Sequence, residues 1–450
     1  MKKILIAMAA LALLTGAASK LTERQRAEHA LNRLAFGARP GDVDRVVAEG
    51  VDRWIARQLR PEGIADAAVD AKLSGFETLK KDNGDMIDEY YKPIVAARRA
   101  RKEGEEVEET EETKGLRQKA RRVVAELSAQ RIVRAAESDR QLNEVMVDFW
   151  INHFNVFAGK GIDRFLLTSY ERDTIRPRVW GKFEDLLLAT AKSPAMLFYL
   201  DNARSRRDAI NENYAREIME LHTLGVDGGY TQKDVTELAR VFTGWSIDRR
   251  TGQFVFRRAM HDAGAKTVLG VRLAGGGADE GERMIHFLSR QPATARHIAT
   301  KLCQRLVADE PPKPLVDRVA KVFLSTDGDL RATTKAVIDS PEFWDAKVYR
   351  AKMKTPFEYV ISALRASNAR VINANPIARA LQQIGQPLYG AQPPTGYSDK
   401  AEAWMNSGAE VNRMNFAVDL AENKFPGVKV ETADAKKLAL ELGGPEFQKQ

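Results

Sequence analysis

The sequence predicts an all-α protein: a multi-helix globular bundle with a small β-hairpin excursion near residues 254–272. Two observations lead to this prediction. Through most of the chain, apolar residues recur at i, i+3, i+4 and i+7, the spacing that lines one face of a helix. Only residues 251–273 depart from this period, because they gather Phe, Val and Thr, which favour strands, on either side of a short polar segment.

Composition places the chain among globular proteins. Of its 450 residues, 44% are hydrophobic and 29% are charged, which is enough apolar material for a large core. The formal net charge is +8, yet the sequence contains no long Lys/Arg tract with interleaved aromatic residues. We therefore expect no binding of nucleic acid.

The N-terminus resembles a secretory signal peptide over residues 1–19. Lys2 and Lys3 precede an apolar run, and small residues follow it up to Ser19, where cleavage is expected. The apolar run is too short to span a bilayer, so no transmembrane segment is expected after its removal. The single cysteine, Cys303, cannot form an intrachain disulfide. These features predict a periplasmic or secreted protein.

The rest of the chain divides into five predicted regions. Residues 20–100 form an N-terminal helical subdomain that begins at Thr22, where a capping-box pattern starts the first helix. Residues 101–115 form an acidic loop, expected to cap a helical hairpin. A central helical core with the motif region spans 116–250, the β excursion 251–280, and a C-terminal helical region 281–450. The last region contains a Pro/Gly-rich loop from residue 385, and loops of this length are more often functional than passive.

The stretch 211–245 concentrates the most polar residues, and it reads as helix, Gly-rich turn and helix. On a helical wheel Glu212, Arg216 and Glu220 share one face, which predicts a ladder of opposite charges. His222 falls on the apolar arc, so it is expected to face the core. Thr231 precedes the second helix and can cap it together with Asp234.

Several motifs together resemble the bacterial family catalogued as domain of unknown function 1800. They are DFWINHF (148–154), the YERDTIRP run (170–177), the 211–245 stretch, QPATA followed by IA and KL (291–302), and KTPFEYV (354–360). The resemblance implies an exported, largely helical protein without an established activity. It also implies a partner, because family members are often encoded beside a secreted protein of the alkaline phosphatase/sulfatase-like type.

The candidate site residues come from the 211–223 helix, the end of DFWINHF and the 261–266 loop. We expect catalytic residues among Glu212, Arg216, Glu217, His261 and Asp262, and ligand-binding residues among Asn152, His153, Asn213 and Lys266. A carboxylate near Arg216 has the chemistry for acid/base work if it is buried. No motif identifies a cofactor, and HExxH is absent, so any metal site would need ligands from separate elements.

Three functions stay open from the sequence. One is a hydrolase or transferase that acts on an envelope or extracellular polymer, a reading that rests on the predicted compartment. The second is a non-catalytic envelope scaffold or assembly partner, in which polar helix faces only specify packing. The third is a metal-binding protein with ligands drawn from His153, Glu217, His222, His261 and Asp262. Convergence of the polar residues at 212–222, 153 and 261–262 in one pocket would favour an enzyme or a ligand-binding protein, and their dispersal into separate salt bridges would count against it.

Overall fold

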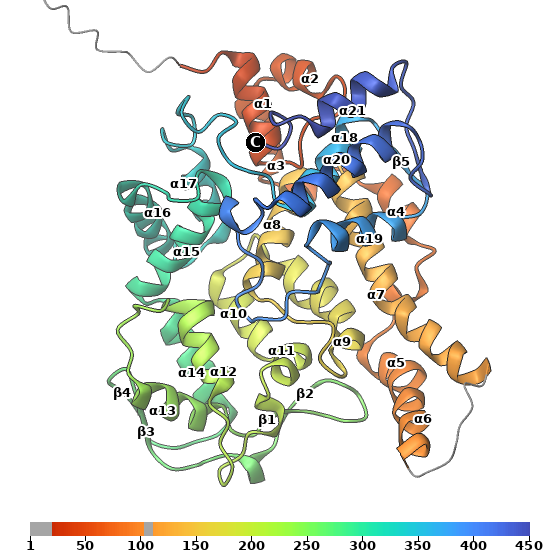
Figure 1. The fold of residues 1–450 in the computed structure, drawn as a ribbon. Helices are drawn as coiled ribbons and strands as arrows, with labels where there is room; N and C mark the ends of the chain where they lie inside the picture. The colour runs from red at the N-terminus through yellow and green to blue at the C-terminus, as the bar shows by residue number, and fades with distance from the viewer. Residues whose placement is uncertain (1–19, 103–110) are drawn as a thin grey trace, which may run out of the picture.

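The computed structural model describes residues 20–102 and 111–450. The predicted signal peptide (1–19) and most of the predicted acidic loop (103–110) lie outside the described residues. Helices dominate the rest, and the predicted all-α class is confirmed (Figure 1). In the first half of the chain the helices are α1 (Glu23–Arg33), α2 (Asp42–Glu49), α3 (Val51–Gln58), α4 (Ala67–Leu73), α5 (Asn83–Met86), α6 (Lys92–Lys102), α7 (Glu111–Glu137), α8 (Gln141–His153), α9 (Asp163–Ser169), α10 (Phe183–Ala191), α11 (Pro194–Tyr199) and α12 (Asn213–Glu217).

The second half continues the helical pattern and adds the strands. Its helices are α13 (Gln232–Phe242), α14 (Ala278–Ser289), α15 (Pro292–Leu306), α16 (Lys313–Ser325), α17 (Leu330–Ile338), α18 (Pro356–Ala366), α19 (Asn375–Ile384), α20 (Ser407–Ala421) and α21 (Ala435–Gly443). Among residues 20–102 and 111–450, no helix combines the length and the apolar composition needed to cross a bilayer.

The predicted β excursion is confirmed and consists of two antiparallel hairpins. Strand β1 (Trp245–Ile247) pairs with β2 (Phe254–Phe256), and β3 (Lys266–Val268) pairs with β4 (Val271–Leu273). The polar segment that contains His261 therefore connects two hairpins and is not the turn of one. A further short pair joins β5 (Arg370–Val371) to β6 (Val428–Lys429).

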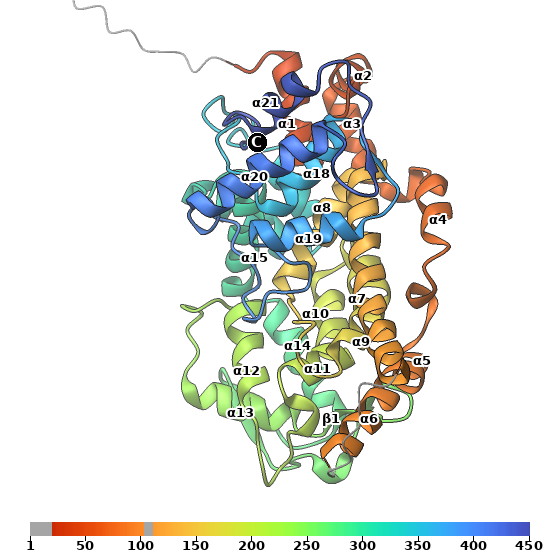
Figure 2. The same ribbon diagram turned by 45° about the vertical axis from the view of Figure 1, so that its right-hand side comes forward.

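The two ends of the described chain meet at one pole of the molecule. The N-terminal helices α1 and α2 and the C-terminal helices α20 and α21 lie together at the top of both views (Figures 1 and 2). One apolar cluster runs from Ala27 to Leu442 and joins most of the helices, and a second, smaller cluster contains Met86, Tyr90, Ala120, Val123 and Phe165. The capping boxes predicted at Thr22 and Thr231 both form, with Gln25 and Asp234 as the reciprocal partners.

Helix α8 runs through the interior, and most of its residues are buried. It contacts α3, α7 and a π-helical turn at Tyr170–Ile175. A second π-helical turn, Ile218–Thr223, continues α12 and packs against α14 and α15. These two turns fall inside motif stretches, whereas a third, Ile87–Tyr91, does not. π-helical turns are frequent at functional sites.

Candidate functional site

The end of α8 borders a cavity of about 160 Å³, which we call the His pocket. Four elements contribute to it: α8, the π-helical turn Ile218–Thr223, α15 and the long loop after α19. The lining residues are Phe149, Asn152, His153, Glu220, Leu221, Val226, His297, Lys301, Thr395 and Asp399. The pocket therefore joins segments that are far apart in the sequence, and most of these segments belong to the motifs on which the family resemblance rests.

The side chains of two histidines form hydrogen bonds with backbone carbonyl groups of the π-helical turn Ile218–Thr223. Nε2 of His153 lies 3.3 Å from the carbonyl oxygen of His222, and Nε2 of His297 lies 3.0 Å from that of Leu221. Because a carbonyl oxygen only accepts, each Nε2 carries the proton and donates it. The ring centroid of His153 lies at similar distances from those of His222 (6.1 Å) and His297 (6.0 Å).

Burial keeps these imidazoles neutral. It lowers the pKa of His222 to about 3 and that of His297 to about 4. The pKa of His153 also falls well below its ordinary value, first through burial and then through the neighbouring His297 and His222. Nε2 of His222 is buried and has no hydrogen-bond partner among the described residues. A buried nitrogen without a partner is a position where water or a ligand group gains a hydrogen bond.

The π-helical turn changes which residues of the 211–223 helix share a face. Arg216 pairs with Glu212 at 3.3 Å, as the predicted ladder requires. Within the described residues no ion pair joins Arg216 to Glu220, so the second half of the predicted ladder is wrong. The wheel assumed 100° per residue, whereas a π-helical turn rotates less per residue and redirects Glu220 into the His pocket. The core-facing position predicted for His222 is confirmed, because it is only 2% exposed.

The Pro/Gly-rich loop closes over the end of α8. Nδ2 of Asn152 donates to the carbonyl of Tyr397 at 2.8 Å, and the Tyr397 amide donates back to Oδ1 of Asn152 at 2.7 Å. Asn155 donates to the carbonyls of Ala391 and Pro393. This docking places Asp399 at the His pocket, where burial raises the pKa of its carboxyl group against the opposing effect of Arg305. Nη1 of Arg305 lies 3.8 Å from Oδ1 of Asp399.

A smaller cavity of about 30 Å³ adjoins the His pocket, and Phe149, Asn152 and Asp399 line both spaces. This volume accommodates about one water molecule. Its charged lining is internally paired, since Asp148 accepts from Arg131 and, at 3.1 Å, from Arg305. The smaller cavity therefore supports the loop and the helix end and offers no space for a substrate.

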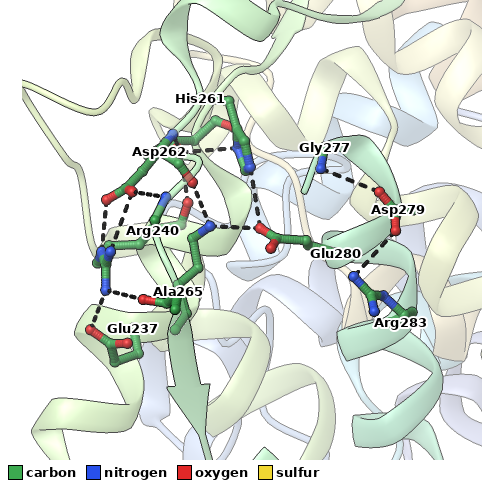
Figure 3. A network of polar contacts seen from close by, with 12 residues as sticks. Glu237, Arg240, His261, Asp262, Ala265, Gly277, Asp279, Glu280 and Arg283 are labelled. Carbon is green, nitrogen blue, oxygen red and sulfur yellow. Dashed lines mark hydrogen bonds and ion pairs between the residues drawn. The ribbon is translucent and has the colours of Figure 1, made fainter. Parts of the chain in front are cut away.

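The other predicted site residues form separate clusters. Lys266 donates to Glu280 at 2.6 Å. Nε2 of His261 lies 3.2 Å from the same carboxylate oxygen, and Figure 3 shows His261 directed at Glu280. Figure 3 also shows Arg240 between Asp262 and Glu237, at 2.7 Å and 2.8 Å. Arg240 holds the pKa of Asp262 below its usual value. None of these residues lines the His pocket.

The sequence-predicted residues on α12 are partly structural. Glu212 accepts from Gln232 and Thr236 on α13, and these bonds fasten α12 to α13. Asn213 donates weakly to the carbonyl of Leu200. Glu217 is half-buried, and burial followed by the nearby Glu220 raises the pKa of its carboxyl group. The structure thus brings Asn152 and His153 into the His pocket and leaves the other predicted site residues outside it: Glu212, Asn213, Arg216, Glu217, His261, Asp262 and Lys266.

The described residues provide no ready set of metal ligands. Among residues 20–102 and 111–450, no group of three or more His, Cys, Asp or Glu side chains has the arrangement that could hold a metal ion. The histidines of the pocket point their Nε2 protons at carbonyls, which removes those nitrogens as ligands unless the protons are lost.

Five polar pocket residues had not been predicted as site residues: Glu220, His297, Lys301, Thr395 and Asp399. The spacing of His297 and Lys301, i and i+4 inside a motif helix, is a signal that could have indicated a shared face. Thr395 and Asp399 lie in the loop whose length predicted a function, but nothing in the sequence tells which of its residues turns inward.

Comparison with known proteins agrees with the motif content. No curated protein and no solved structure matches the chain. The sequence model of one family, described as "Protein of unknown function (DUF1800)", matches residues 29–450, which is nearly the whole chain. The chain belongs to the DUF1800 family.

Proposed function

We propose that the protein is exported and acts as a hydrolase or transferase on a hydroxyl-rich polymer of the envelope or the extracellular space, with the His pocket as its active site. One observation carries this proposal. Four elements from different parts of the chain direct chemically active side chains to a single cavity, where burial shifts the pKa values of His153, His297 and Asp399. Shifted pKa values in a cleft are typical of functional sites.

The carboxyl groups supply the acid/base chemistry in this proposal. A raised pKa keeps the Asp399 carboxyl protonated to higher pH, which suits a general acid that protonates a leaving group. Glu220 is the second carboxyl group of the pocket and comes from a different element. Two carboxyl groups on opposite sides of a bond are the arrangement that most glycoside-cleaving enzymes use.

In this proposal the histidines of the pocket bind the substrate and do not act as general bases. Their lowered pKa values make them weak proton acceptors at neutral pH. A neutral imidazole that donates through Nε2 still has a lone pair on Nδ1, and Nδ1 of His153 and of His297 makes no hydrogen bond to any described residue. Such acceptors suit the hydroxyl groups of a sugar.

Export rests on the N-terminal sequence, in which two lysines precede a short apolar run and small residues. A secreted partner of the alkaline phosphatase/sulfatase-like type belongs to the same proposal, because it would share the compartment. Cell fractionation of an epitope-tagged strain tests export: we expect the protein outside the cytoplasm, and retention inside it after deletion of residues 1–19. Cross-linking followed by affinity purification from the same fraction tests the partner.

Release of soluble reducing ends from peptidoglycan and from extracellular polysaccharides measures the proposed activity. We expect Asp399→Asn and Glu220→Gln to lower the rate by roughly 100-fold or more, since general acid/base groups contribute about this much. Glu212→Gln is the matched control, because this carboxylate lies outside the pocket and bonds to α13. Activity that survives both pocket substitutions would reject the proposal, and full complementation of a deletion strain by both variants would favour the scaffold.

A further inference from the structure

A second cavity, of about 250 Å³, lies beneath the N-terminal helices and shares no residue with the His pocket. We call it the Arg pocket. It is formed by α1, α2, α3, the segment that enters α8, and α18. Its lining residues are Leu31, Asp42, Arg45, Trp54, Arg57, Gln58, Asp139, Gln141 and Arg365.

The buried part of the lining is held in place by bonds to the backbone. Gln58 donates to the carbonyl of Asp139 and accepts from the amide of Leu142. Gln141 accepts from the amide of Phe36 and donates to the carbonyls of Ala135 and Ser138. The floor of the pocket is therefore fixed before any ligand arrives, which lowers the entropic cost of binding.

Arg365 is the charged residue of this floor and is 4% exposed. Its guanidinium donates to the carbonyl of Gly37 at 2.8 Å, to that of Ala136 at 3.1 Å and to Asp42 at 3.3 Å. A guanidinium has five N–H groups, so two of them remain without an acceptor among the described residues. Trp54 lines the same cavity, and its indole N–H makes no hydrogen bond to any described residue.

Three guanidinium groups (Arg45, Arg57 and Arg365) and two carboxylates (Asp42 and Asp139) line the cavity, so positive charge exceeds negative charge by one. Asp42 accepts from both Arg45, at 2.8 Å, and Arg365, so one carboxylate serves two guanidinium groups. Arg57 lies at the exposed rim and pairs with Glu49, which is not part of the lining. Burial, followed by the charge of Arg39, lowers the pKa of Arg365 to about 9. A group whose pKa falls next to like charges gains from an added anion.

We propose that the Arg pocket binds a small organic anion: one carboxylate or phosphate group on a compact, partly apolar body. Arg45 and Arg57 keep N–H groups that their bonds to Asp42 and Glu49 do not use, and together with the free N–H groups of Arg365 these supply the charged donors that both oxyanions prefer. The volume exceeds that of an oxyanion alone, and Leu31 and Trp54 offer apolar surface for the body that carries it. The pocket is a binding site distinct from the proposed active site.

Isothermal titration of the purified protein with glucuronate, glucose 6-phosphate and glucose tests the proposal. These probes share a sugar body and differ in charge. We expect saturable binding of at least one anion and none of glucose. Tighter binding of glucuronate would identify a carboxylate site, and tighter binding of glucose 6-phosphate a phosphate site.

Two rim variants and one control assign the binding to this cavity. Arg57→Gln and Arg45→Gln should each weaken binding by about tenfold, the effect of losing one charge-assisted hydrogen bond. Arg53→Gln is the control, because Arg53 is exposed on the same helix as Arg57 and lies outside the lining. Failure of both anions to bind, equal binding of glucose, or unchanged affinity in both rim variants would overturn the proposal.

Discussion

Nζ of Lys266 lies 2.6 Å from Oε2 of Glu280, and neither side chain is exposed to solvent. His261 approaches the same oxygen, so one carboxylate joins the loop between the hairpins to the first turn of α14. The other carboxylate oxygen, Oε1, has no hydrogen-bond partner among the described residues. A buried pair of this kind is expensive to break, because removal of one partner leaves the other charge without compensation.

Replacement of Lys266 by Ala should therefore destabilise the fold by about 3–5 kcal/mol. The reason is the buried carboxylate of Glu280, which keeps only His261 as a partner. Urea unfolding followed by circular dichroism measures the change in the free energy of unfolding. The double replacement Lys266→Met with Glu280→Leu should recover much of the loss, because it removes both charges and fills the space with apolar atoms.

The exposed pair between Glu212 and Arg216 provides the comparison for this experiment. Both side chains are about one-third exposed or more, so Arg216→Ala should lower stability by about 1 kcal/mol or less. Equal losses for Lys266→Ala and Arg216→Ala would show that burial does not set the strength of the Lys266–Glu280 pair.

Stability should fall in mild acid because of two buried histidines, His222 and His297. The pKa of His222 is lowered to about 3 and that of His297 to about 4, from an ordinary value of 6.5. A depressed pKa means that the unfolded chain takes up the proton first. The stabilisation is complete above pH 6.5, is lost progressively as the pH drops below it, and is gone below the folded pKa. Each histidine contributes a slope of up to about 1.4 kcal/mol per pH unit.

Unfolding free energies between pH 7 and pH 5 test this slope, since carboxylates with ordinary or lowered pKa values change little in that range. His297→Gln should lower the slope of the unfolding free energy against pH by up to about 1.4 kcal/mol per pH unit, the contribution of one histidine. Thr300→Ala is the control on the same helix α15 and should leave the slope unchanged, because it removes no titratable group. An equal slope in wild type and in His297→Gln would contradict the assignment of this pH dependence to His297.

The contact between Gly396 and Asn152 is expected to control docking of the long loop. Gly396 has a φ of +69°, and a Cβ at this position would lie 2.4 Å from the carbonyl oxygen of Asn152. Gly396→Ala should cost roughly 1–3 kcal/mol of backbone strain and loosen the loop from α8. Limited proteolysis measures the loosening as faster cleavage within residues 385–400.

A matched glycine separates this contact from a general effect of alanine. Gly408 lies in α20, and its φ is outside the left-handed region. The atom nearest to a Cβ added at Gly408 would be 3.5 Å away. Gly408→Ala should leave proteolysis of the loop unchanged and slightly stabilise the helix. Equal cleavage in Gly396→Ala and wild type would show that the loop is held by other contacts.

The sequence predicted the helices well because burial of one face imposes a local period. The capping boxes at Thr22 and Thr231 could be read from four residues each, and the core position of His222 from a wheel. The place of Glu220 could not be read in this way. A π-helical turn depends on tertiary packing against α14 and α15, and it rotates every residue that follows it.

The candidate site could be predicted only in part, for a related reason. Asn152 and His153 were identified because an aromatic-rich helix ends there. Their neighbour Asp399 is brought to them by the loop, through bonds between Asn152 and Tyr397 that cross 245 residues of sequence. No periodicity links residues at such a separation. His261 and Lys266 illustrate the converse, because chemically active residue types on a loop prove to be engaged with the buried Glu280.

Cys303, the single cysteine of the chain, should be unreactive in the folded protein. Its side chain is fully buried in α15, and burial raises the pKa of the thiol to about 12. The thiolate is the reactive form, so at mildly alkaline pH only about one molecule in 10,000 would carry it even if reagent could enter. Reaction with Ellman's reagent should therefore be negligible in buffer and reach one equivalent in denaturing guanidinium.

The dependence of this labelling on denaturant tells which motion exposes the thiol. If α15 opens only when the whole protein unfolds, the free energy for exposure of Cys303 should equal that of global unfolding and should rise and fall with it among the variants above. Lys266→Ala should then accelerate labelling by the factor that its loss of stability predicts. Rapid labelling of the wild type, at a rate independent of denaturant, would mean instead that α15 detaches locally, and the His pocket that it helps to line would open with it.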